Sequence, residues 1–276
     1  MAKKESFALK FLYNTVPGRC ILKIMASRGV SVLCGKFMDS PLSCCLIPGF
    51  IAKNKIDMGD YVWQEYHSFN EFFCRRIIKE KRPISADPKD FTAPCDGLLS
   101  AYRISDETVI PVKQSSYTIP ELLGGDPAAY AYKDGICLVF RLCVDNYHRY
   151  SYLDDGVKGG NFFIPGELHT VRPIALAALP VFIRNCREYT VMETAHFGKV
   201  TQVEVGAMLV GRIVNNMGAG SFKKGEEKGR FEYGGSTVVV LLEKDRVRLP
   251  EKLFANTQKG IETRVKMGQK IGRSIV

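Results

Sequence analysis

Residues 233–242 read YGGSTVVVLL, and this stretch is the strongest local signal for the fold. The run from Val238 to Leu242 is β-branched and aliphatic, which predicts a buried strand. The two glycines before it give the backbone conformations that residues with a Cβ avoid. Ser236 is therefore expected where a turn meets a rigid strand, a place where a hydroxyl can attack a strained neighbouring peptide bond. Taken alone, Gly-Gly-Ser before a strand is more often an ordinary turn.

The rest of the chain beyond residue 92 carries short apolar runs separated by Gly, Pro, Asn and Asp. This spacing favours a β-rich core over alternating βαβ units. The clearest predicted strands are residues 136–143, 201–205, 207–214 and 237–242. Helices are predicted at residues 63–76, 120–123 and 174–178, and an exposed, lysine-rich loop at residues 223–229. The predicted fold class is α+β, with a barrel- or sandwich-like β-rich core behind an N-terminal helical region.

The N-terminal region differs from the rest, because large apolar residues alternate with lysines at helical spacing. We expect two or three short amphipathic helices within residues 1–60 and a second unit over residues 61–276. The helices could form a cap packed on the core, or an interfacial segment that meets anionic lipid. Residues 1–60 and 237–276 each hold nine Lys or Arg against four Asp or Glu, so the two ends carry the whole net charge of +10. Basic ends suggest an anionic partner.

Composition narrows the class of protein further. With 276 residues and 46% hydrophobic content, the chain can bury a sizeable core. Its nine cysteines include no C-x-x-C pair, which suits a reducing compartment and makes a metal site improbable. No uninterrupted apolar run reaches the roughly 18–20 residues that span a bilayer, and the N-terminus has no secretory signal pattern. Nothing resembles a nucleic-acid-binding module, so nucleic acid is not an expected partner.

Candidate catalytic side chains follow predicted strands and turns. Asp96 lies in the turn-like segment APCDG, and His148 follows the predicted strand at residues 136–143. The four histidines are His67, His148, His169 and His196, so the choice of a base that titrates near neutral pH is short. Together Asp96, His148 and Ser236 could form an Asp–His–Ser arrangement, although each residue alone also has an ordinary structural explanation. The sequence has no G-x-S-x-G elbow, P-loop or H-E-x-x-H motif.

Several segments, in order, resemble the phosphatidylserine decarboxylase family. They are SFNEFFCRR at residues 68–76, APCDG at 93–97, DNYHR at 145–149, ETAHFG at 193–198, VGA at 205–207, and KGEEKGRF at 224–231 leading into GGST at 234–237. The resemblance covers about residues 60–245, and its combined specificity is high although each motif is modest. Residues 1–50 carry no motif, but their basic amphipathic character is similar to the membrane-associated starts of that family.

This resemblance implies a self-processing enzyme. His148, oriented by Asp96, would activate Ser236 to attack the Gly235 carbonyl, and the chain would be cut at 235/236 into a β chain (1–235) and an α chain (236–276). Ser236 would become a pyruvoyl group, the cofactor, whose Schiff base with phosphatidylserine releases CO2 and leaves phosphatidylethanolamine. The two chains would stay together as a heterodimer that can pair further. The resemblance also implies a peripheral protein on the cytoplasmic face of the cell membrane, with an anionic membrane surface as a partner.

One position departs from a common family pattern, because Ser151 stands where many members have a second histidine three residues after that of the Tyr-His-Arg motif. His148 must then serve both self-cleavage and decarboxylation, or be helped by His169 or His196. Arg149 beside it could meet an anionic lipid or form a structural ion pair. Two other functions stay open at this point: an Asp–His–Ser hydrolase that keeps Ser236 intact, and a non-catalytic protein that binds anionic lipid.

Overall fold

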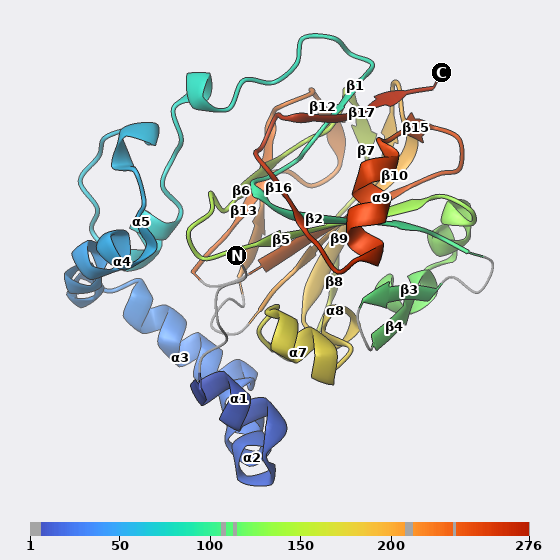
Figure 1. Cartoon of the computed structure of the whole chain (residues 1–276). Coiled ribbons are helices and arrows are strands. Elements are labelled where there is room, and N and C mark those ends of the chain that lie inside the picture. Colours follow the sequence, from blue (N-terminus) through green and yellow to red (C-terminus); the bar gives the residue numbers. More distant parts are fainter. Residues whose placement is uncertain (1–6, 106–108, 113–114, 208–211, 234–235, 276) are drawn as a thin grey trace.

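The computed structural model describes residues 7–105, 109–112, 115–207, 212–233 and 236–275. Within these residues, a string of helices leads into a core of antiparallel strands (Figure 1). This confirms the predicted α+β class with a β-rich core and an N-terminal helical region. The boundary that the sequence suggests near residue 60 stays a prediction.

The helical region consists of α1 (Phe7–Asn14), α2 (Val16–Met25), α3 (Arg28–Met38), the 3-10 helix η1 (Pro41–Leu46) and α4 (Ile47–Asn54). Thr15 caps α2 by accepting a hydrogen bond from the Gly18 N–H at 3.1 Å, and Ser27 caps α3. Tyr13 and Leu22 are buried against the core, whereas many apolar side chains on the other faces of these helices are exposed. The helices thus cover part of the core and also present an apolar surface, so the two predicted roles are compatible.

The main sheet has nine strands among the described residues, in the order β12-β7-β9-β10-β14-β5-β2-β16, with β8 also beside β9. Their bounds are β2 (Gly97–Arg103), β5 (Ile136–Leu142), β7 (Gly156–Lys158), β8 (Phe162–Ile164), β9 (Arg187–Thr194), β10 (Gly198–Val205), β12 (Gly220–Phe222), β14 (Ser236–Leu242) and β16 (Thr263–Val265). The predicted strands at 136–143, 201–205 and 237–242 are therefore confirmed as β5, β10 and β14.

Smaller sheets and short helices complete the core. One sheet has the order β11-β13-β6, a second β1-β17-β15, and β3 pairs with β4. These strands are β1 (Asp90–Thr92), β3 (Val109–Val112), β4 (Ser115–Thr118), β6 (Arg149–Ser151), β11 (Ile213–Asn215), β13 (Glu227–Phe231), β15 (Val247–Arg248) and β17 (Lys270–Ser274). The remaining helices are η2 (Met58–Asp60), α5 (Phe69–Phe73), η3 (Lys79–Lys81), α6 (Ile119–Leu122), η4 (Pro127–Tyr132), α7 (Pro173–Ala178), α8 (Val181–Arg184) and α9 (Glu251–Gln258). The helices predicted at 120–123 and 174–178 are confirmed as α6 and α7.

Strand β14 lies in the middle of the main sheet, between β10 and β5. Val238, Val240 and Leu242 belong to the hydrophobic cluster on one face, which includes residues of β6 and β13. Val239 and Leu241 belong to the cluster on the other face, which includes Tyr13 of α1 and residues of α7 and α8. All seven residues of β14 are buried, which explains why its sequence shows no polar alternation.

One predicted helix is wrong in its length, and one predicted strand is tested only in part. The helix predicted at 63–76 is only the five-residue α5, because the Val62 N–H donates to the Arg76 carbonyl and Tyr61 forms a bridge with Ile77. These contacts hold both ends of the segment in a strand-like pair, so only the middle can coil. Of the predicted strand at 207–214, residues 208–211 lie outside the described residues, and β11 begins at Ile213.

The exposed loop predicted at 223–229 is also wrong in its last part, because β13 begins at Glu227. The Lys228 side chain is fully buried, and its Nζ donates to Glu204 Oε1 and to Asn215 Oδ1, each at 2.8 Å. Burial of a charged group is tolerated where an opposite charge and further hydrogen bonds satisfy it. Glu204 and Asn215 lie on other strands, so the local sequence gives no sign of this pairing.

Candidate active site

Ser236 is the first residue of β14 and is fully buried. Its neighbour on β5 is Leu142, and the next residue, Thr237, lies opposite Val205 on β10. Among the residues that the structure describes, the Ser236 hydroxyl oxygen Oγ has no hydrogen-bond partner. A buried hydroxyl without a partner is costly, and such groups in native proteins are often functional. Gly234 and Gly235 lie outside the described residues, so the predicted cleavage site is described on its Ser236 side only.

His148 lies between β5 and β6, and its imidazole is almost fully buried. The Nδ1 atom is 2.9 Å from the carbonyl oxygen of Asn146. A carbonyl only accepts hydrogen bonds, so Nδ1 carries the proton and Nε2 holds the lone pair of the neutral ring. His148 therefore has the tautomer that a base acting through Nε2 requires.

Packing brings His148 close to the segment that leads into Ser236. The His148 carbonyl accepts from the N–H of Phe231, the last residue of β13, at 2.9 Å. The ring of Phe73 lies between the two regions, with its centroid 4.2 Å from that of His148 and 5.3 Å from that of Tyr233. His148 and the segment before Ser236 thus share one wall of aromatic side chains.

Strand register places Asp96 at the same end of the sheet. In the antiparallel pair of β2 and β5, Leu98 pairs with Arg141, so Asp96, two residues before Leu98, is level with Cys143. Leu142, the residue before Cys143, pairs with Ser236 of β14. The structure therefore brings Asp96, His148 and Ser236 to one end of three adjacent strands.

The Asp96 carboxylate is buried in an ion pair that the sequence analysis did not identify. It accepts from Arg82 Nε at 2.8 Å and Nη2 at 2.6 Å, and its Oδ1 also accepts from the Met267 N–H at 2.9 Å. A bidentate arginine fixes the orientation of a carboxylate and compensates its buried charge. Arg82 lies six residues after the SFNEFFCRR segment, and no sequence spacing links it to Asp96. The role of Asp96 in orienting His148 stays a prediction.

The two auxiliary histidines occupy different places. His196 lies two residues before β10, which begins at Gly198. The other end of β10, Val205, pairs with Thr237, so the length of the strand, roughly 23 Å, separates His196 from the Ser236 end. Its Nδ1 is 2.9 Å from Asp154 Oδ1. His169 lies nearer to Ser236. The Asn185 side chain donates both to the His169 carbonyl and to the carbonyl of Gly206, the residue after the Val205 that pairs with Thr237. Its imidazole contacts Glu167 at 2.8 Å and Tyr13 at 3.5 Å.

Arg149 forms a structural ion pair, one of the two roles open for it. Its guanidinium donates to the Cys74 carbonyl at 2.9 and 2.7 Å and to Glu227 Oε1 at 2.7 Å. These contacts join the C-terminal end of α5 to β6 and β13.

The groups around His148 are held neutral by burial. Burial raises the pKa of the Tyr147 phenol to about 12 and that of the Cys74 thiol to about 12. It also raises the pKa of the Cys95 thiol, next to Asp96, well above its usual value. The same burial strengthens the Arg82–Asp96 and Arg149–Glu227 ion pairs at this end of the sheet, because few water molecules screen them.

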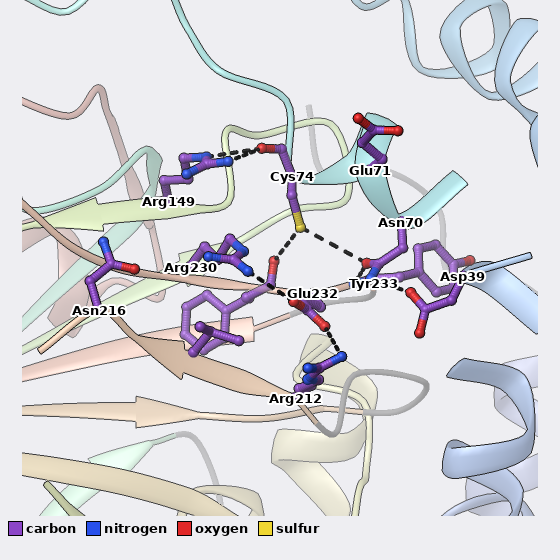
Figure 2. A network of polar contacts seen from close by, with 12 residues as sticks. Asp39, Asn70, Glu71, Cys74, Arg149, Arg212, Asn216, Arg230, Glu232 and Tyr233 are labelled. Atoms are coloured by element: carbon purple, nitrogen blue, oxygen red, sulfur yellow. Dashed lines mark hydrogen bonds and ion pairs between the residues drawn. The ribbon is translucent and has the colours of Figure 1, made fainter. Parts of the chain in front are cut away.

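Two cavities open beside the segment before Ser236. One of about 290 Å³ lies between α3 and residues 163–168, with Arg212 and Tyr233 in its wall. The other, of about 720 Å³, has Arg76, Arg149 and Arg230 in its wall. Asp39, Asn70 and Glu232 line both. Figure 2 shows Glu232 between Arg212, at 3.0 Å, and Arg230, at 3.2 Å.

The sequence pattern predicts no role for Asn70, Arg212 or Glu232 individually. Asn70 lies inside the SFNEFFCRR motif, and Glu232 directly follows the KGEEKGRF motif. These two motifs are the only sequence signal for either residue.

The fold brings a buried serine at the start of a central strand to the same end of the sheet as a histidine and a carboxylate. Comparisons with known proteins agree with this class. The profile of the family described as Phosphatidylserine decarboxylase matches residues 69–273. The phosphatidylserine decarboxylase proenzyme 2 of Clostridium acetobutylicum is 45% identical over 267 residues, or 96% of this chain and 91% of that protein. The proenzyme of Clostridium novyi is 37% identical over 273 residues, or 97% and 92% of the two chains. The chain belongs to the phosphatidylserine decarboxylase family.

Proposed function

We propose that this chain is a proenzyme that cuts itself between Gly235 and Ser236 and then decarboxylates phosphatidylserine. The family membership supports the reaction, and relatives that share nearly the full length are named as proenzymes of it. The observation that carries the proposal is the Ser236 hydroxyl, which is fully buried at the start of β14 without a hydrogen-bond partner among the described residues. Such a hydroxyl is available to react with the adjoining peptide.

His148 acts as the base in this proposal. Nε2 takes the proton of Ser236 Oγ, and Oγ attacks the carbonyl carbon of Gly235. The Gly235–Ser236 C–N bond breaks as the C–O ester bond forms, which frees the Ser236 amine. Loss of the Ser236 α-proton then expels the Gly235 carboxylate with the former Oγ and leaves a dehydroalanine. Water hydrolyses that group to ammonia and a pyruvoyl group, and the β chain (1–235) and α chain (236–276) remain together.

The surroundings of Ser236 suit a pyruvoyl group. β14 stays buried between β10 and β5, so a carbonyl at its first residue would be held rigidly and away from bulk water. A bound pyruvoyl group supplies an electron sink for the pair of electrons that departing CO2 leaves behind. In this proposal His148 returns a proton to the carbon that CO2 leaves. Burial raises the pKa of the Tyr147 phenol and of the Cys74 thiol, so these groups stay protonated and do not compete as bases.

The test is an intact-mass spectrum of the purified wild type beside Ser236→Ala. We expect two chains in the wild type, split after Gly235, with a pyruvoyl N-terminus on the smaller one, and a single chain in the variant. The variant lacks the attacking oxygen, so activity should also be abolished. A wild type that stays whole would contradict the proposal and favour the hydrolase or the lipid-binding function, and a processed, active Ser236→Ala chain would exclude Ser236 as the nucleophile.

We also propose that the protein is peripheral on the cytoplasmic face of the cell membrane. The helical region exposes large apolar side chains, namely Phe7, Phe11, Val16, Ile21, Ile24, Val32, Leu33, Phe37, Leu42 and Leu46. Lysines and arginines are interspersed among them, which is the composition of an interfacial surface that favours anionic lipid. No single helix of the described residues is long and apolar enough to cross a bilayer, although the pair Gly29–Met38 and Pro41–Asn54, bent by 81°, passes by length and composition.

A further inference from the structure

The Asn70 carboxamide joins three separate segments of the chain (Figure 2). Its Oδ1 accepts a hydrogen bond from the main-chain N–H of Tyr233 at 2.9 Å. Its Nδ2 donates to Asp39 Oδ1 at 2.7 Å. Asn70 belongs to α5, Asp39 is the C-cap of α3, and Tyr233 is three residues before Ser236.

The chemistry of the two partners leaves only one orientation for this amide. A main-chain N–H can only donate, and a carboxylate can only accept. Oδ1 must therefore face Tyr233 and Nδ2 must face Asp39. The Cys74 sulfur lies 3.5 Å from the Phe231 carbonyl oxygen and 3.9 Å from Asn70 Oδ1, so its thiol also faces the oxygen of this amide. The charged acceptor at Asp39 strengthens its hydrogen bond and so fixes the amide.

The main chain before the cleavage site is held at consecutive residues. The Glu232 N–H donates to the Arg212 carbonyl at 3.1 Å, and the Asn70 amide holds the next N–H. The Tyr233 ring packs against Phe69, with 4.9 Å between ring centroids. Tyr233 is the last described residue before Ser236, so its position fixes the start of the connection to Ser236.

We propose that Asn70 is a positioning residue for self-cleavage and that Asp39 sets the orientation of its amide. Asn70 holds the Tyr233 peptide so that the chain between Tyr233 and Ser236 presents the Gly235 carbonyl to Oγ. This inference rests on the proposed self-cleavage. Attack within a peptide needs the reacting atoms at about 3–3.5 Å, and a displacement of about 1 Å can cost roughly 100-fold in rate. The hydrogen bond from the Tyr233 N–H to Asn70, three residues before Ser236, can therefore change the rate of self-cleavage strongly.

The test exchanges the two side chains without changing the total charge. In Asn70→Asp, the new carboxylate still accepts from Tyr233 but faces the Asp39 carboxylate, so the two repel. In the double variant Asp39→Asn with Asn70→Asp, the amide introduced on α3 donates to the carboxylate introduced on α5, and the whole set of contacts is restored. The single variant Asp39→Asn is the matched control, because an asparagine oxygen can still accept from Asn70 Nδ2.

Self-cleavage of the full-length chain is followed by pulse–chase labelling and gel separation of the uncut chain and the two products. We expect Asn70→Asp to slow cleavage by about tenfold or more, and Asp39→Asn and the double variant to stay within about threefold of wild type. Thermal unfolding of each variant in the uncut Ser236→Ala chain checks that it folds. If Asn70→Asp does not fold, Asn70→Ser removes both contacts without adding charge and is expected to slow cleavage to the same degree.

Three results would overturn the inference. These are cleavage of Asn70→Asp at the wild-type rate, a double variant as slow as Asn70→Asp, and, where Asn70→Ser is needed, its cleavage at the wild-type rate. Each would show that the amide does not act through the contacts described above. Failure of the wild type itself to cleave would instead contradict the proposed function, so the two failures are distinguishable.

Discussion

The Asp96 carboxylate shows how much a single residue depends on its partners. Two of its hydrogen bonds, both buried, come from Arg82, and a third, partly buried, comes from the Met267 N–H. The arginine compensates the buried negative charge, and a carboxylate held in this way is what would stabilise a protonated imidazole nearby. The residue type could be predicted from the sequence as an acid at a turn. Its partner could not, because Arg82 reaches it only after the chain folds over the end of the sheet.

His169 predicts a pH dependence of stability at the residue scale. Burial lowers the pKa of His169 below its usual value of 6.5, although the Glu167 carboxylate opposes this. The folded state then binds a proton less readily than the unfolded state, so stability is complete above about pH 6.5 and is lost as the pH falls through the lower folded-state pKa. Tyr13, whose hydroxyl is near Nδ1, and Arg184, which also pairs with Glu167, face the same site.

Urea unfolding of the uncut Ser236→Ala chain at pH 7.5 and pH 5.5 measures this effect. We expect the free energy of unfolding to fall between the two, and to fall by less when His169→Gln is added, because glutamine does not titrate. An equal fall in both chains would show that His169 does not contribute.

Strand β13 carries a prediction at the scale of an element. Gly229 pairs with Asn215 of β11 on one side and with Tyr150 of β6 on the other. A Cβ at this position would lie 2.2 Å from the Val214 carbonyl oxygen and 2.7 Å from the Tyr150 hydroxyl. Main-chain atoms in the middle of a sheet have little room to move, so Gly229→Ala should cost about 3 kcal/mol or more.

The measurement is thermal unfolding in the uncut Ser236→Ala chain. Gly229→Ala is expected to lower Tm by roughly 6–12 °C, given about 2–4 °C per kcal/mol for a chain of this size. Gly218→Ala is the control, because a Cβ there meets nothing within 4 Å, and its Tm should change by no more than about 2 °C. Equal shifts in the two variants would contradict the close approach of the three strands.

The elements differ in how far the sequence could predict them, and the reason is where their partners lie. β14 and β5 each contain a run of five apolar residues, so local composition was enough to predict both. β13 reads EKGRF, and its burial depends on Glu204 and Asn215, which pair with Lys228 across strands. At the candidate site, Ser236 and His148 could be singled out from motifs, whereas the contacts of Asn70 and Arg82 join segments far apart in the sequence.

At the scale of the whole molecule, the helix α3 borders both a cavity beside the proposed site and the exposed apolar surface. Residues Ser31, Gly35 and Met38 of α3 line the smaller cavity, together with Tyr233. Leu33 and Phe37 of the same helix are exposed, and α3 extends away from the β core (Figure 1). A lipid held by this helix would have its head group near the cavity that Tyr233 lines, three residues before Ser236. This arrangement suits a substrate whose acyl chains stay in the bilayer.

Trp63 makes this arrangement measurable, because it is the only tryptophan in the chain and is 90% exposed. We expect its emission to move to shorter wavelength with vesicles that contain anionic lipid, as an indole leaves water for the interface. The shift should weaken when ionic strength rises from about 0.1 M to about 1 M, which shortens the Debye length from about 10 Å to about 3 Å. Vesicles of neutral phosphatidylcholine should cause a smaller shift.

Leu33→Ser should weaken vesicle binding by about tenfold or more, since burying a leucine side chain contributes about 1.5–3 kcal/mol. Val157→Ser is the matched control, because Val157 is also exposed but lies on β7, away from the helical region (Figure 1). Flotation with vesicles measures binding of both variants independently of Trp63. Equal binding of both variants and wild type, with an unchanged Trp63 emission, would leave the apolar helices without a membrane role and favour a purely structural cap. Loss of binding in Leu33→Ser alone would place the lipid surface on α3, directly beside the cavity that Tyr233 lines.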